Sequence, residues 1–329
     1  MIFSNLIFYF FISIISLIFM GYISRKYELY DIPTKNKIHK VKTPNIAGLS
    51  IIILLIFCQI INNYAFKIYI IFNLTIIFVV IGFFDDLKNF SPSKKLFFIS
   101  IPIIYFCAEL SQINFITTVN DKNITLGNFS FMFTFLCIIL FVNAINYMDG
   151  IDGLISILSI FSLLYIIIFL PYNYWNIIVP IICFLLIFLF FNFGIFEKQF
   201  LGNSGSLGLG FILSSYSIYF TQNERIILPS LIIWCLAFYV YEFLTINIIR
   251  IKRKKNLFKK DLNFIFNIFQ KRYSKTKTIV MCSIIHLFFL FNGIIIYIYN
   301  LNNISFLLFT FYFFIYLYFR FLIMKKFIN

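Results

Sequence analysis

Long apolar runs separated by short polar segments cover the chain from end to end. Each run spans roughly 17 to 22 residues, enough to cross a hydrocarbon core of about 30 Å as an α-helix. The pattern predicts an all-α polytopic membrane protein that forms one domain over residues 1–329. We place eleven membrane spans, near residues 3–23, 47–62, 67–84, 96–111, 130–145, 154–170, 176–193, 206–220, 227–249, 278–299 and 304–323.

The basic residues fall mainly in every second polar segment. If the N-terminus lies outside, Lys67, Lys122 and Arg225 are the outside basic residues, and the other Lys and Arg residues fall in or beside the inside segments. This distribution is typical of the positive-inside rule. It predicts an outside N-terminus, a cytosolic C-terminus and a first apolar run that is retained as a helix rather than cleaved as a signal peptide.

Composition supports a membrane protein and argues against a nucleic-acid-binding role. Hydrophobic residues make up 62% of the 329 residues, and the net charge is +15. Because the positive charge flanks the spans, it indicates contact with anionic membrane lipids. The six cysteines lie inside apolar runs, where thiols behave as small hydrophobic groups, and their spacing does not indicate a metal site.

Two segments between the spans have a pattern of their own. In the longest outside segment, residues 115–119 and 124–128 flank Asn120-Asp121, which predicts a short β-hairpin. On the inside, the basic residues of 250–260 precede an apolar stretch at 262–269. That order predicts a helix lying in the membrane interface.

A polar hinge separates two of the runs, between Asn143 and Leu154. It holds two asparagines, two glycines, and two carboxylates three residues apart, Asp149 and Asp152. A charged residue at membrane depth costs about 3 kcal/mol, so such residues usually mark a functional site. Capping of the following helix would account for one of these side chains, not for four. Oxygen ligands beside glycines predict a magnesium–phosphate site.

Three further polar clusters fall on the predicted cytosolic side. Asp85 and Asp86 end one span, where adjacent carboxylates repel unless a cation or bound metal lies nearby. The glycine–serine turn at 200–210 opens a helix whose first amides could bind an anion, and its later glycines fit close helix packing. The basic segment 31–48 could bind a diphosphate or lipid headgroups. A solvated helix end and an ordinary inside loop are the simpler alternatives for the first and last of these clusters.

Taken in order, these clusters resemble the polyprenyl-phosphate N-acetylhexosamine-1-phosphate transferases of glycosyltransferase family 4. The resemblance covers most of the chain, and the hinge is its closest match. The first segment and the Asn-Ala-x-Asn form are similar to the amino-sugar initiating branch rather than the muramoyl-pentapeptide branch. The matching segments are Asp31-x-Pro33…Lys37-x-His39…Pro44…Gly48, Gly82-x-x-Asp85-Asp86, Ser91-Pro92…Lys95, Asn143-Ala144-x-Asn146-x-x-Asp149-Gly150-x-Asp152-Gly153-Leu154 and Phe200-Leu201-Gly202-Asn203-Ser204-Gly205-Ser206.

The resemblance implies a reaction at the cytosolic face of the plasma membrane. A UDP-N-acetylhexosamine would donate its sugar 1-phosphate to polyprenyl (undecaprenyl) phosphate, giving UMP and a lipid-linked diphospho-sugar that starts a cell-envelope polysaccharide. The implied cofactor is Mg²⁺, with ligands Asp85, Asp86 and Asn203. The implied catalytic residues are Asp85, Asp86, Asp149 and Asp152. The implied substrate contacts are Lys37, His39, Lys95, Asn143, Asn146, Gly202, Ser204 and Gly205.

Two positions depart from the family's pattern. Asn203 stands where the family has an aspartate, and an amide oxygen can bind magnesium but brings no charge. His39 and His286 are the only histidines, and His286 is expected to be a core residue because it lies in an apolar run. With Asp261 aligned to the aspartate of the family's last large cytosolic loop, the positions of its histidine cluster hold Phe264, Phe266 and Asn267. Both departures predict weaker metal and phosphate binding.

Three hypotheses therefore stand. The first is an active transferase, and the second is a catalytically impaired relative that serves as a membrane scaffold or regulator. The third is a transporter that uses intramembrane carboxylates, against which the lack of an evident internal repeat weighs. The expected partners are polyprenyl phosphate, a UDP-N-acetylhexosamine and membrane lipids, with no nucleic acid, and a homodimer is left open.

Overall fold

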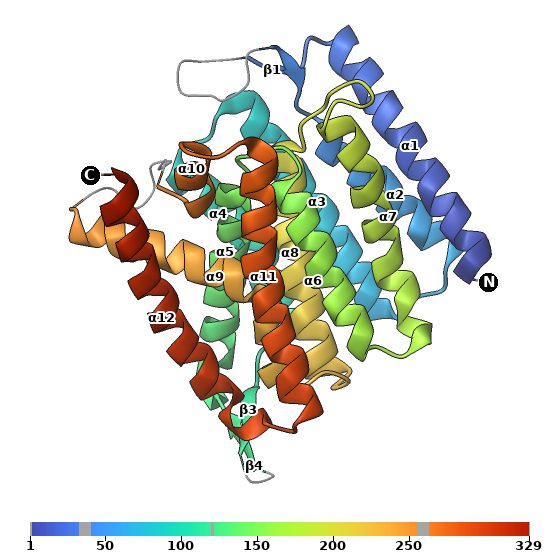
Figure 1. Cartoon of the computed structure of the whole chain (residues 1–329). Coiled ribbons are helices and arrows are strands. Elements are labelled where there is room, and N and C mark those ends of the chain that lie inside the picture. Colours follow the sequence, from blue (N-terminus) through green and yellow to red (C-terminus); the bar gives the residue numbers. More distant parts are fainter. Residues whose placement is uncertain (1, 33–40, 120–121, 255–262, 329) are drawn as a thin grey trace.

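The computed structural model describes residues 2–32, 41–119, 122–254 and 263–328, and these form an almost entirely helical bundle (Figure 1). Lys37 and His39, for which phosphate contacts are predicted, lie outside the described residues. The α-helices of the described part are α1 (Ile2–Lys26), α2 (Ser50–Ile61), α3 (Phe66–Lys88), α4 (Pro92–Tyr105), α5 (Ser130–Met148), α6 (Leu154–Phe169), α7 (Trp175–Asn192), α8 (Gly202–Ile218), α9 (Pro229–Lys252), α10 (Ile265–Gln270), α11 (Lys275–Ile298) and α12 (Asn302–Ile328).

Short elements join these helices. Two antiparallel strand pairs are formed by β1 (Tyr30–Asp31) with β2 (Thr43–Pro44) and by β3 (Phe115–Val119) with β4 (Lys122–Thr125). Single helical turns of 3-10 or π type are η1 (Ala47–Leu49), η2 (Phe106–Leu110), η3 (Gly127–Phe129), η4 (Tyr172–Tyr174) and η5 (Tyr219–Asn223).

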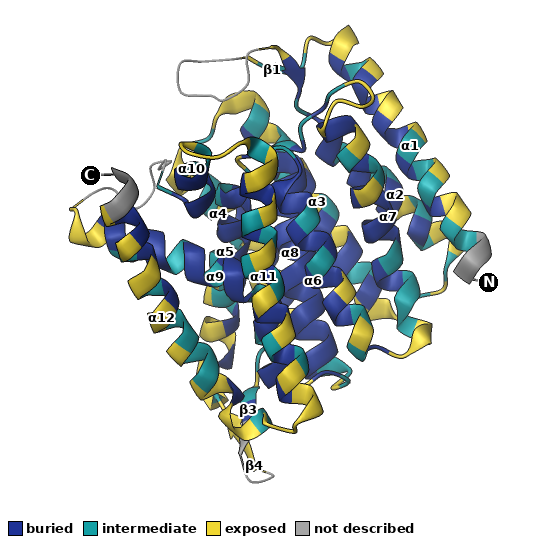
Figure 2. Ribbon diagram, viewed as in Figure 1, coloured by how far each residue is buried: buried dark blue, intermediate teal, exposed yellow. Residues whose placement is uncertain are grey.

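α8 lies in the middle of the bundle and is packed against α3 and α5. All of its residues from Ser204 to Ile218 are buried, and Figure 2 shows this helix in the dark blue of buried residues. A Cβ on Gly208 would lie 2.6 Å from Cγ2 of Val79, and one on Gly210 would lie 2.8 Å from Cα of Val142. The predicted close packing at these glycines is therefore confirmed.

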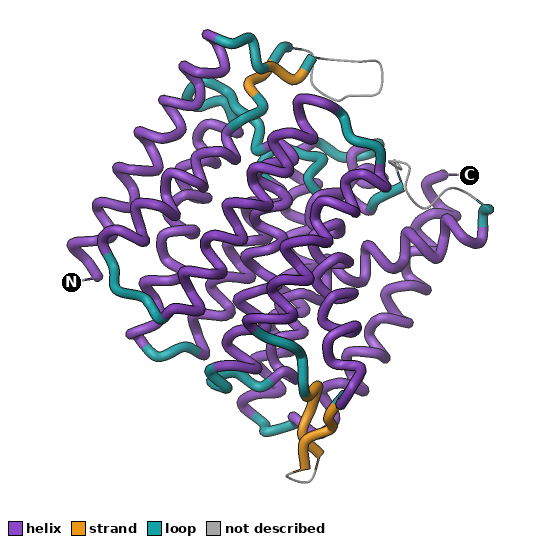
Figure 3. Tube along the Cα trace, turned by 180° about the vertical axis from the view of Figure 1, so that it is seen from behind, coloured by secondary structure: helices purple, strands orange, loops and turns teal. Residues whose placement is uncertain are grey.

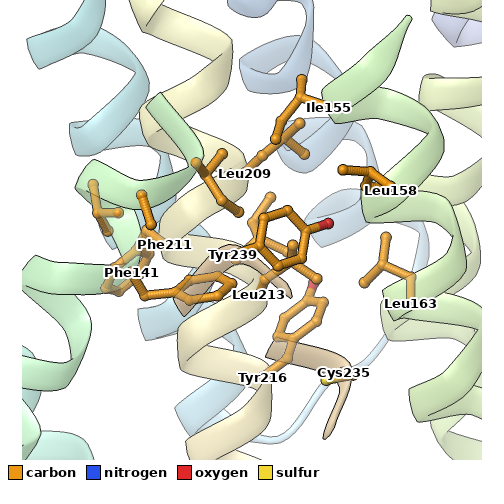
Figure 4. Packing of buried hydrophobic residues seen from close by; sticks show 14 of the residues in the cluster. Phe141, Ile155, Leu158, Leu163, Leu209, Phe211, Leu213, Tyr216, Cys235 and Tyr239 are labelled. Carbon is orange, nitrogen blue, oxygen red and sulfur yellow. The ribbon is translucent and has the colours of Figure 1, made fainter. Parts of the chain in front are cut away.

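Large apolar side chains from several helices fill the interior around α8 (Figure 4). Leu209 of α8, Ile155 of α6 and Tyr239 of α9 belong to the same buried cluster. The hydroxyl of Tyr216 donates a hydrogen bond to the carbonyl of Ile177 at 3.1 Å, so this buried polar group is satisfied. Such dense packing gives the polar residues at the ends of the helices a rigid support.

Seven helices of the described part are long and apolar enough to cross a membrane: α1, α3, α5, α7, α9, α11 and α12. The other four predicted spans also contain helices, but α2, α4, α6 and α8 have 12, 14, 16 and 17 residues. Those lengths fall short of the roughly 20 residues that a span usually needs. The all-helical membrane fold is confirmed, whereas the count of eleven spans and the orientation stay predictions.

The β3–β4 hairpin projects from one end of the bundle, and β1 and α10 lie at the opposite end (Figures 1 and 3). The hairpin was predicted, although its second strand begins at Lys122 rather than at 124. The side chain of Gln222 connects it to the bundle by accepting from the Asn114 amide at 2.9 Å and donating to the Phe115 carbonyl at 3.0 Å.

α10 corrects the prediction of an interfacial helix after the basic segment. An interfacial helix would turn its apolar side chains toward lipid. Those of α10 are instead buried within the protein: Ile265, Phe266, Ile268 and Phe269. The prediction was wrong because the partner of this apolar face is the end of the bundle, including the hinge.

Candidate functional site

The hinge between α5 and α6 is held by backbone geometry and by the end of α7. Gly153 has a φ of +79°, and a Cβ there would lie 2.3 Å from the Phe193 ring. Its N–H donates to the side-chain oxygen of Asn192 at 2.5 Å, and the Asn192 side chain donates to the Gln199 carbonyl at 2.8 Å. Only glycine fits this left-handed, crowded position without strain. The hinge is therefore a fixed turn.

The first turn of α8 receives a carboxylate from a different helix. Asp86, at the end of α3, accepts the backbone N–H of Asn203 at 3.1 Å and that of Ser204 at 3.2 Å. Gly202 has a φ of +73°, and a Cβ on it would lie 2.6 Å from the Asp86 carboxylate. The glycine–serine turn does bind an anion, as helix N-termini favour, but that anion is the protein's own side chain.

A ring of polar side chains connects four helices at this end of the bundle. Nζ of Lys95 (α4) lies 3.0 Å from Oδ2 of Asp85 (α3) and donates to Oδ1 of Asn146 (α5) at 2.7 Å. Asn146 in turn donates to Oδ1 of Asn203 (α8) at 2.7 Å. Since the backbone N–H of Asn203 donates to Asp86, the ring closes on α3. We call Asp85, Asp86, Lys95, Asn146 and Asn203 the polar ring.

The polar ring is largely shielded from solvent. The side chain of Lys95 is 14% exposed and that of Asp85 is 8% exposed. Asp85 also accepts the Phe90 N–H at 2.9 Å, so both of its oxygens have donors. Buried charges persist only when they are paired and hydrogen-bonded, which is the case here. Repulsion was predicted for the aspartate pair unless a cation lies nearby, and the Lys95 ammonium is that cation.

Asp152 forms a second cluster, on the other side of the hinge sequence. Its Oδ2 contacts Nζ of Lys198, from the segment before α8, at 2.7 Å, and it also contacts Nζ of Lys275, the first residue of α11. The two lysine side chains are 39% and 41% exposed. Two ammonium groups on one carboxylate leave an excess of positive charge at a solvent-accessible place, which suits a phosphorylated ligand.

Several predicted site residues have other surroundings. Asn143 donates to the carbonyl of Ile139 in its own helix at 2.8 Å. Ser204 is buried, and its hydroxyl donates to the Leu201 carbonyl at 3.2 Å. Gly205 packs against the Leu201 side chain and the backbone of Gly48, because a Cβ on it would lie 2.3 Å from Cγ of Leu201 and 3.1 Å from Cα of Gly48. These contacts support helix packing and give no indication of a substrate contact.

Sequence reasoning missed Lys198, Lys275 and Ser206. The two lysines were counted only as loop charge, since nothing in their spacing connects them to Asp152. Ser206 accepts a second hydrogen bond from Asn146 at 2.7 Å. It stands within the glycine–serine turn, and its spacing of three residues from Asn203 was a usable signal for one helix face.

Phenylalanines occupy the expected histidine positions and pack on the hinge. Phe264 and Phe266 are buried, with ring centroids 5.5 Å apart. A Cβ on Gly150 would lie 2.6 Å from the Phe266 ring, and the Phe264 ring lies 6.2 Å from that of Tyr147. His286 is buried in α11, as predicted, and its Nε2 lies 3.0 Å from the Ser162 hydroxyl. Apolar contact with the hinge therefore replaces any imidazole chemistry at 264 and 266.

The side-chain oxygens of the polar ring are of the type that binds a magnesium ion shared with a substrate. Within the described ranges, no group of three or more His, Cys, Asp or Glu side chains is arranged to hold a metal. Magnesium needs no such cage, because it is usually bound by one or two carboxylates together with substrate phosphates and water. Asp85, Asp86 and the amide oxygen of Asn203 supply hard oxygen ligands of that kind.

Comparison with known proteins places the ring and the hinge within one recognisable region. Residues 68–221 match the family model described as Glycosyl transferase family 4. This region runs from the start of α3 into η5 and includes the polar ring, the hinge and Lys198. No curated protein matches the chain. Lys275 and the α10 aromatics lie beyond the matched region.

Proposed function

We propose that this protein, which carries a glycosyl transferase family 4 domain over residues 68–221, is a sugar-1-phosphate transferase that acts on polyprenyl phosphate in a membrane. The multi-pass helical fold and the family match support this class of enzyme. We further propose that the donor is a UDP-N-acetylhexosamine and the acceptor undecaprenyl phosphate. The products would be UMP and the lipid-linked diphospho-sugar, made at the cytosolic face as the first step of a cell-envelope polysaccharide.

The observation that carries this proposal is the polar ring itself. It draws Asp85, Lys95, Asn146 and Asn203 from four helices of the matched region to one end of the bundle. A purely structural role would not require two carboxylates and an ammonium beside a conformationally fixed polar hinge, because buried charges are costly. Phosphoryl transfer requires this combination of positioning and charge neutralisation.

The side chains divide the work in the following way. The Lys95 ammonium fixes the orientation of the Asp85 carboxylate, and the α8 amides fix that of Asp86. Lys198 and Lys275 offer ammonium groups to the donor's diphosphate beside Asp152. Magnesium, when bound to Asp85, Asp86 and Asn203, would supply further positive charge to the phosphates. The hinge residues Asp149 and Asp152 would line the nucleotide-sugar site.

One set of observations favours an impaired family member as the second candidate. Asn203 contributes no charge to the ring, and Phe264 and Phe266 form an apolar surface on the hinge. A membrane scaffold or regulator would tolerate both features, because it needs the fold but not the charge.

One assay separates the two candidates. Purified protein is incubated with magnesium, undecaprenyl phosphate and a panel of UDP-N-acetylhexosamines, and UMP release is measured. We expect release with at least one donor, and its loss in Asp85→Asn, which removes the carboxylate charge that pairs with Lys95. Glu197→Gln is the matched control, because Glu197 is not a member of the ring and pairs with Arg25 at an exposed site. Absence of UMP with every donor would overturn the enzyme proposal and leave the scaffold.

A further inference from the structure

A fully buried ion pair joins α9 to the last helix. Nε of Arg320 (α12) donates to Oε2 of Glu242 (α9) at 2.9 Å, and Nη2 donates to Oε1 at 3.0 Å, with both side chains at 0% exposure. Neither residue lies in the matched region 68–221 or in the clusters described above. Burial of two charges carries a desolvation cost that the pairing offsets only with good geometry and further hydrogen bonds. Such a pair in a membrane helix is a candidate for a specific role.

The same pair also binds the backbone that leads into α10. Oε1 of Glu242 accepts the N–H of Ile265 at 2.5 Å, and Nη2 of Arg320 donates to the carbonyl of Asn263 at 2.6 Å. The Tyr316 hydroxyl donates to Oε2 of the same carboxylate. Four donors thus meet one carboxylate, and the chain entering α10 is held at the Asn263 carbonyl and at the N–H of Ile265, the first residue of the helix.

The segment held in this way carries the aromatic contact with the hinge. Phe264 lies between the two bound positions, and Phe266 is one residue beyond them. Phe266 is the side chain that a Cβ on Gly150 would meet at 2.6 Å. α10 has only six residues, too few to hold its position by helix formation alone. Its place on the hinge therefore depends on external contacts.

We propose that Glu242 and Arg320 are positioning residues, whose buried pair clamps the start of α10 and so holds Phe264 and Phe266 on the hinge at Gly150. The last helix, α12, thereby becomes part of the site's support. Release of α10 would uncover the hinge that carries Asp149 and Asp152 and would weaken binding of the nucleotide sugar. That last consequence rests on the proposed function, whereas the clamp does not.

Ile265→Pro tests the clamp without breaking the ion pair. Proline removes the N–H that Glu242 accepts, while Arg320 and Tyr316 remain on the carboxylate. Proline is well tolerated at the first position of a helix. The preceding residue, Phe264, already has a φ of −59° and a ψ of 148°, which suit a following proline. Ile265→Val is the matched control, because it reduces the side chain but keeps the N–H.

The readout is the reactivity of a cysteine placed in α10. Ile268 is buried in α10, and we replace it in an Ile268→Cys background. Labelling of that cysteine by a hydrophilic maleimide is followed by mass spectrometry in the purified full chain. Arg320→Met is the second variant, and Glu197→Gln, at an exposed ion pair, is its control. Native Cys58 and Cys235, both buried in other helices, show whether the bundle stays folded.

We expect Ile265→Pro and Arg320→Met to speed labelling of the α10 cysteine by about a hundredfold, with both controls unchanged and the native cysteines protected. Equal labelling in Ile265→Pro and Ile265→Val, or no increase in either clamp variant, would overturn the proposal. If Arg320→Met exposes the native cysteines, Ile265→Pro alone decides the outcome, and exposure there too would show a general folding role and overturn the clamp.

The activity arm keeps this proposal separate from the proposed function. In folded clamp variants we expect KM for the UDP-sugar to rise about tenfold with a smaller change in kcat. If the parent chain releases no UMP, the transferase proposal fails while the labelling result still decides the clamp. If labelling rises but KM does not, α10 is clamped without a role in donor binding, and that part of the inference is wrong.

Discussion

The side chain at position 203 affects the charge of the polar ring, because asparagine is neutral and an aspartate there would add a negative charge. Asp85, Asp86 and Lys95 are the ionisable members of the ring, whereas the side chains of Asn203 and Asn146 are neutral. A divalent cation gains less from such a site than from one with a further carboxylate. Because Oδ1 of Asn203 already accepts from Asn146 at 2.7 Å, an aspartate at 203 would keep that hydrogen bond.

We therefore predict that Asn203→Asp lowers the magnesium concentration for half-maximal UMP release by about tenfold, which corresponds to about 1.4 kcal/mol of binding free energy. The added charge also lies in the first turn of α8, where negative charge is favoured. Ser206→Ala is the control, because it removes the other acceptor of Asn146 without adding charge. An unchanged magnesium titration in Asn203→Asp would contradict the assignment of residue 203 as a metal ligand.

Both oxygens of Asp86 accept backbone N–H groups, whereas one oxygen of Asp85 accepts a backbone N–H and the other contacts the Lys95 ammonium. In Asp86→Asn, the new NH₂ group would face an N–H of the first turn of α8, so one hydrogen bond is lost at a partly buried site. We predict a loss of about 1–3 kcal/mol in the free energy of unfolding, together with loss of UMP release. Thermal unfolding in detergent measures the first effect, and the exposed Glu197→Gln variant should change by less than about 1 kcal/mol. Normal stability in Asp86→Asn would show that the cap is dispensable.

At the scale of elements, the approach of α3 to α8 determines whether the ring can close. A Cβ on Gly82 would lie 2.3 Å from the backbone oxygen of Asn203. The helices can meet here only because residue 82 has no side chain, and this contact brings Asp86 within reach of the α8 amides. The spacing from Gly82 to Asp86 thus reflects the helix contact: Gly82 lets α3 approach α8, and Asp86 then reaches the α8 amides.

Two alanine substitutions on this contact should differ in effect. Gly82→Ala meets backbone, which cannot move without shifting α8, whereas Gly208→Ala meets the Val79 methyl group at 2.6 Å, which can adjust. We predict that Gly82→Ala lowers the free energy of unfolding by about 1–3 kcal/mol and reduces activity, and that Gly208→Ala has a smaller effect on both. Unfolding in detergent and UMP release measure the pair. Equal losses in the two variants would contradict this explanation of the crossing.

At the scale of the whole molecule, the β3–β4 hairpin lies at the opposite end of the bundle from α10 (Figure 1). Phe266 of α10 packs on the hinge at Gly150, which follows the ring residue Asn146 in the chain. The positive-inside distribution predicts that the ring end faces the cytosol and the hairpin end faces outward. We predict that Lys122→Cys is labelled by an impermeant maleimide in intact cells, whereas Lys198→Cys is labelled only after the membrane is opened. Labelling of both from outside would contradict the predicted orientation, and reversed labelling would invert it.

Much of the fold could be predicted because membrane helices are local features. An apolar run of sufficient length indicates a helix without reference to the rest of the chain, and each expected span contains one. Span counts are less secure, because helices such as α6 and α8 are largely buried among longer neighbours and can be shorter than a bilayer. α10 was misjudged for a related reason, since sequence cannot distinguish an apolar face that meets lipid from one that meets protein.

Of the candidate site, the sequence by itself determined the residue types: the aspartate pair, the polar hinge, the glycine–serine turn and the substitution at Asn203. Only the tertiary structure decided their partners. In the folded chain, Asp86 accepts hydrogen bonds from α8 amides, Lys95 pairs with Asp85, and Lys198 and Lys275 both contact Asp152. The physical reason is that a charge is stabilised by whichever opposite group the fold brings within about 3 Å, and sequence distance has no bearing on that. The clearest case is the pair at the start of α10, in which Arg320 binds Glu242 although the two are 78 residues apart in the sequence.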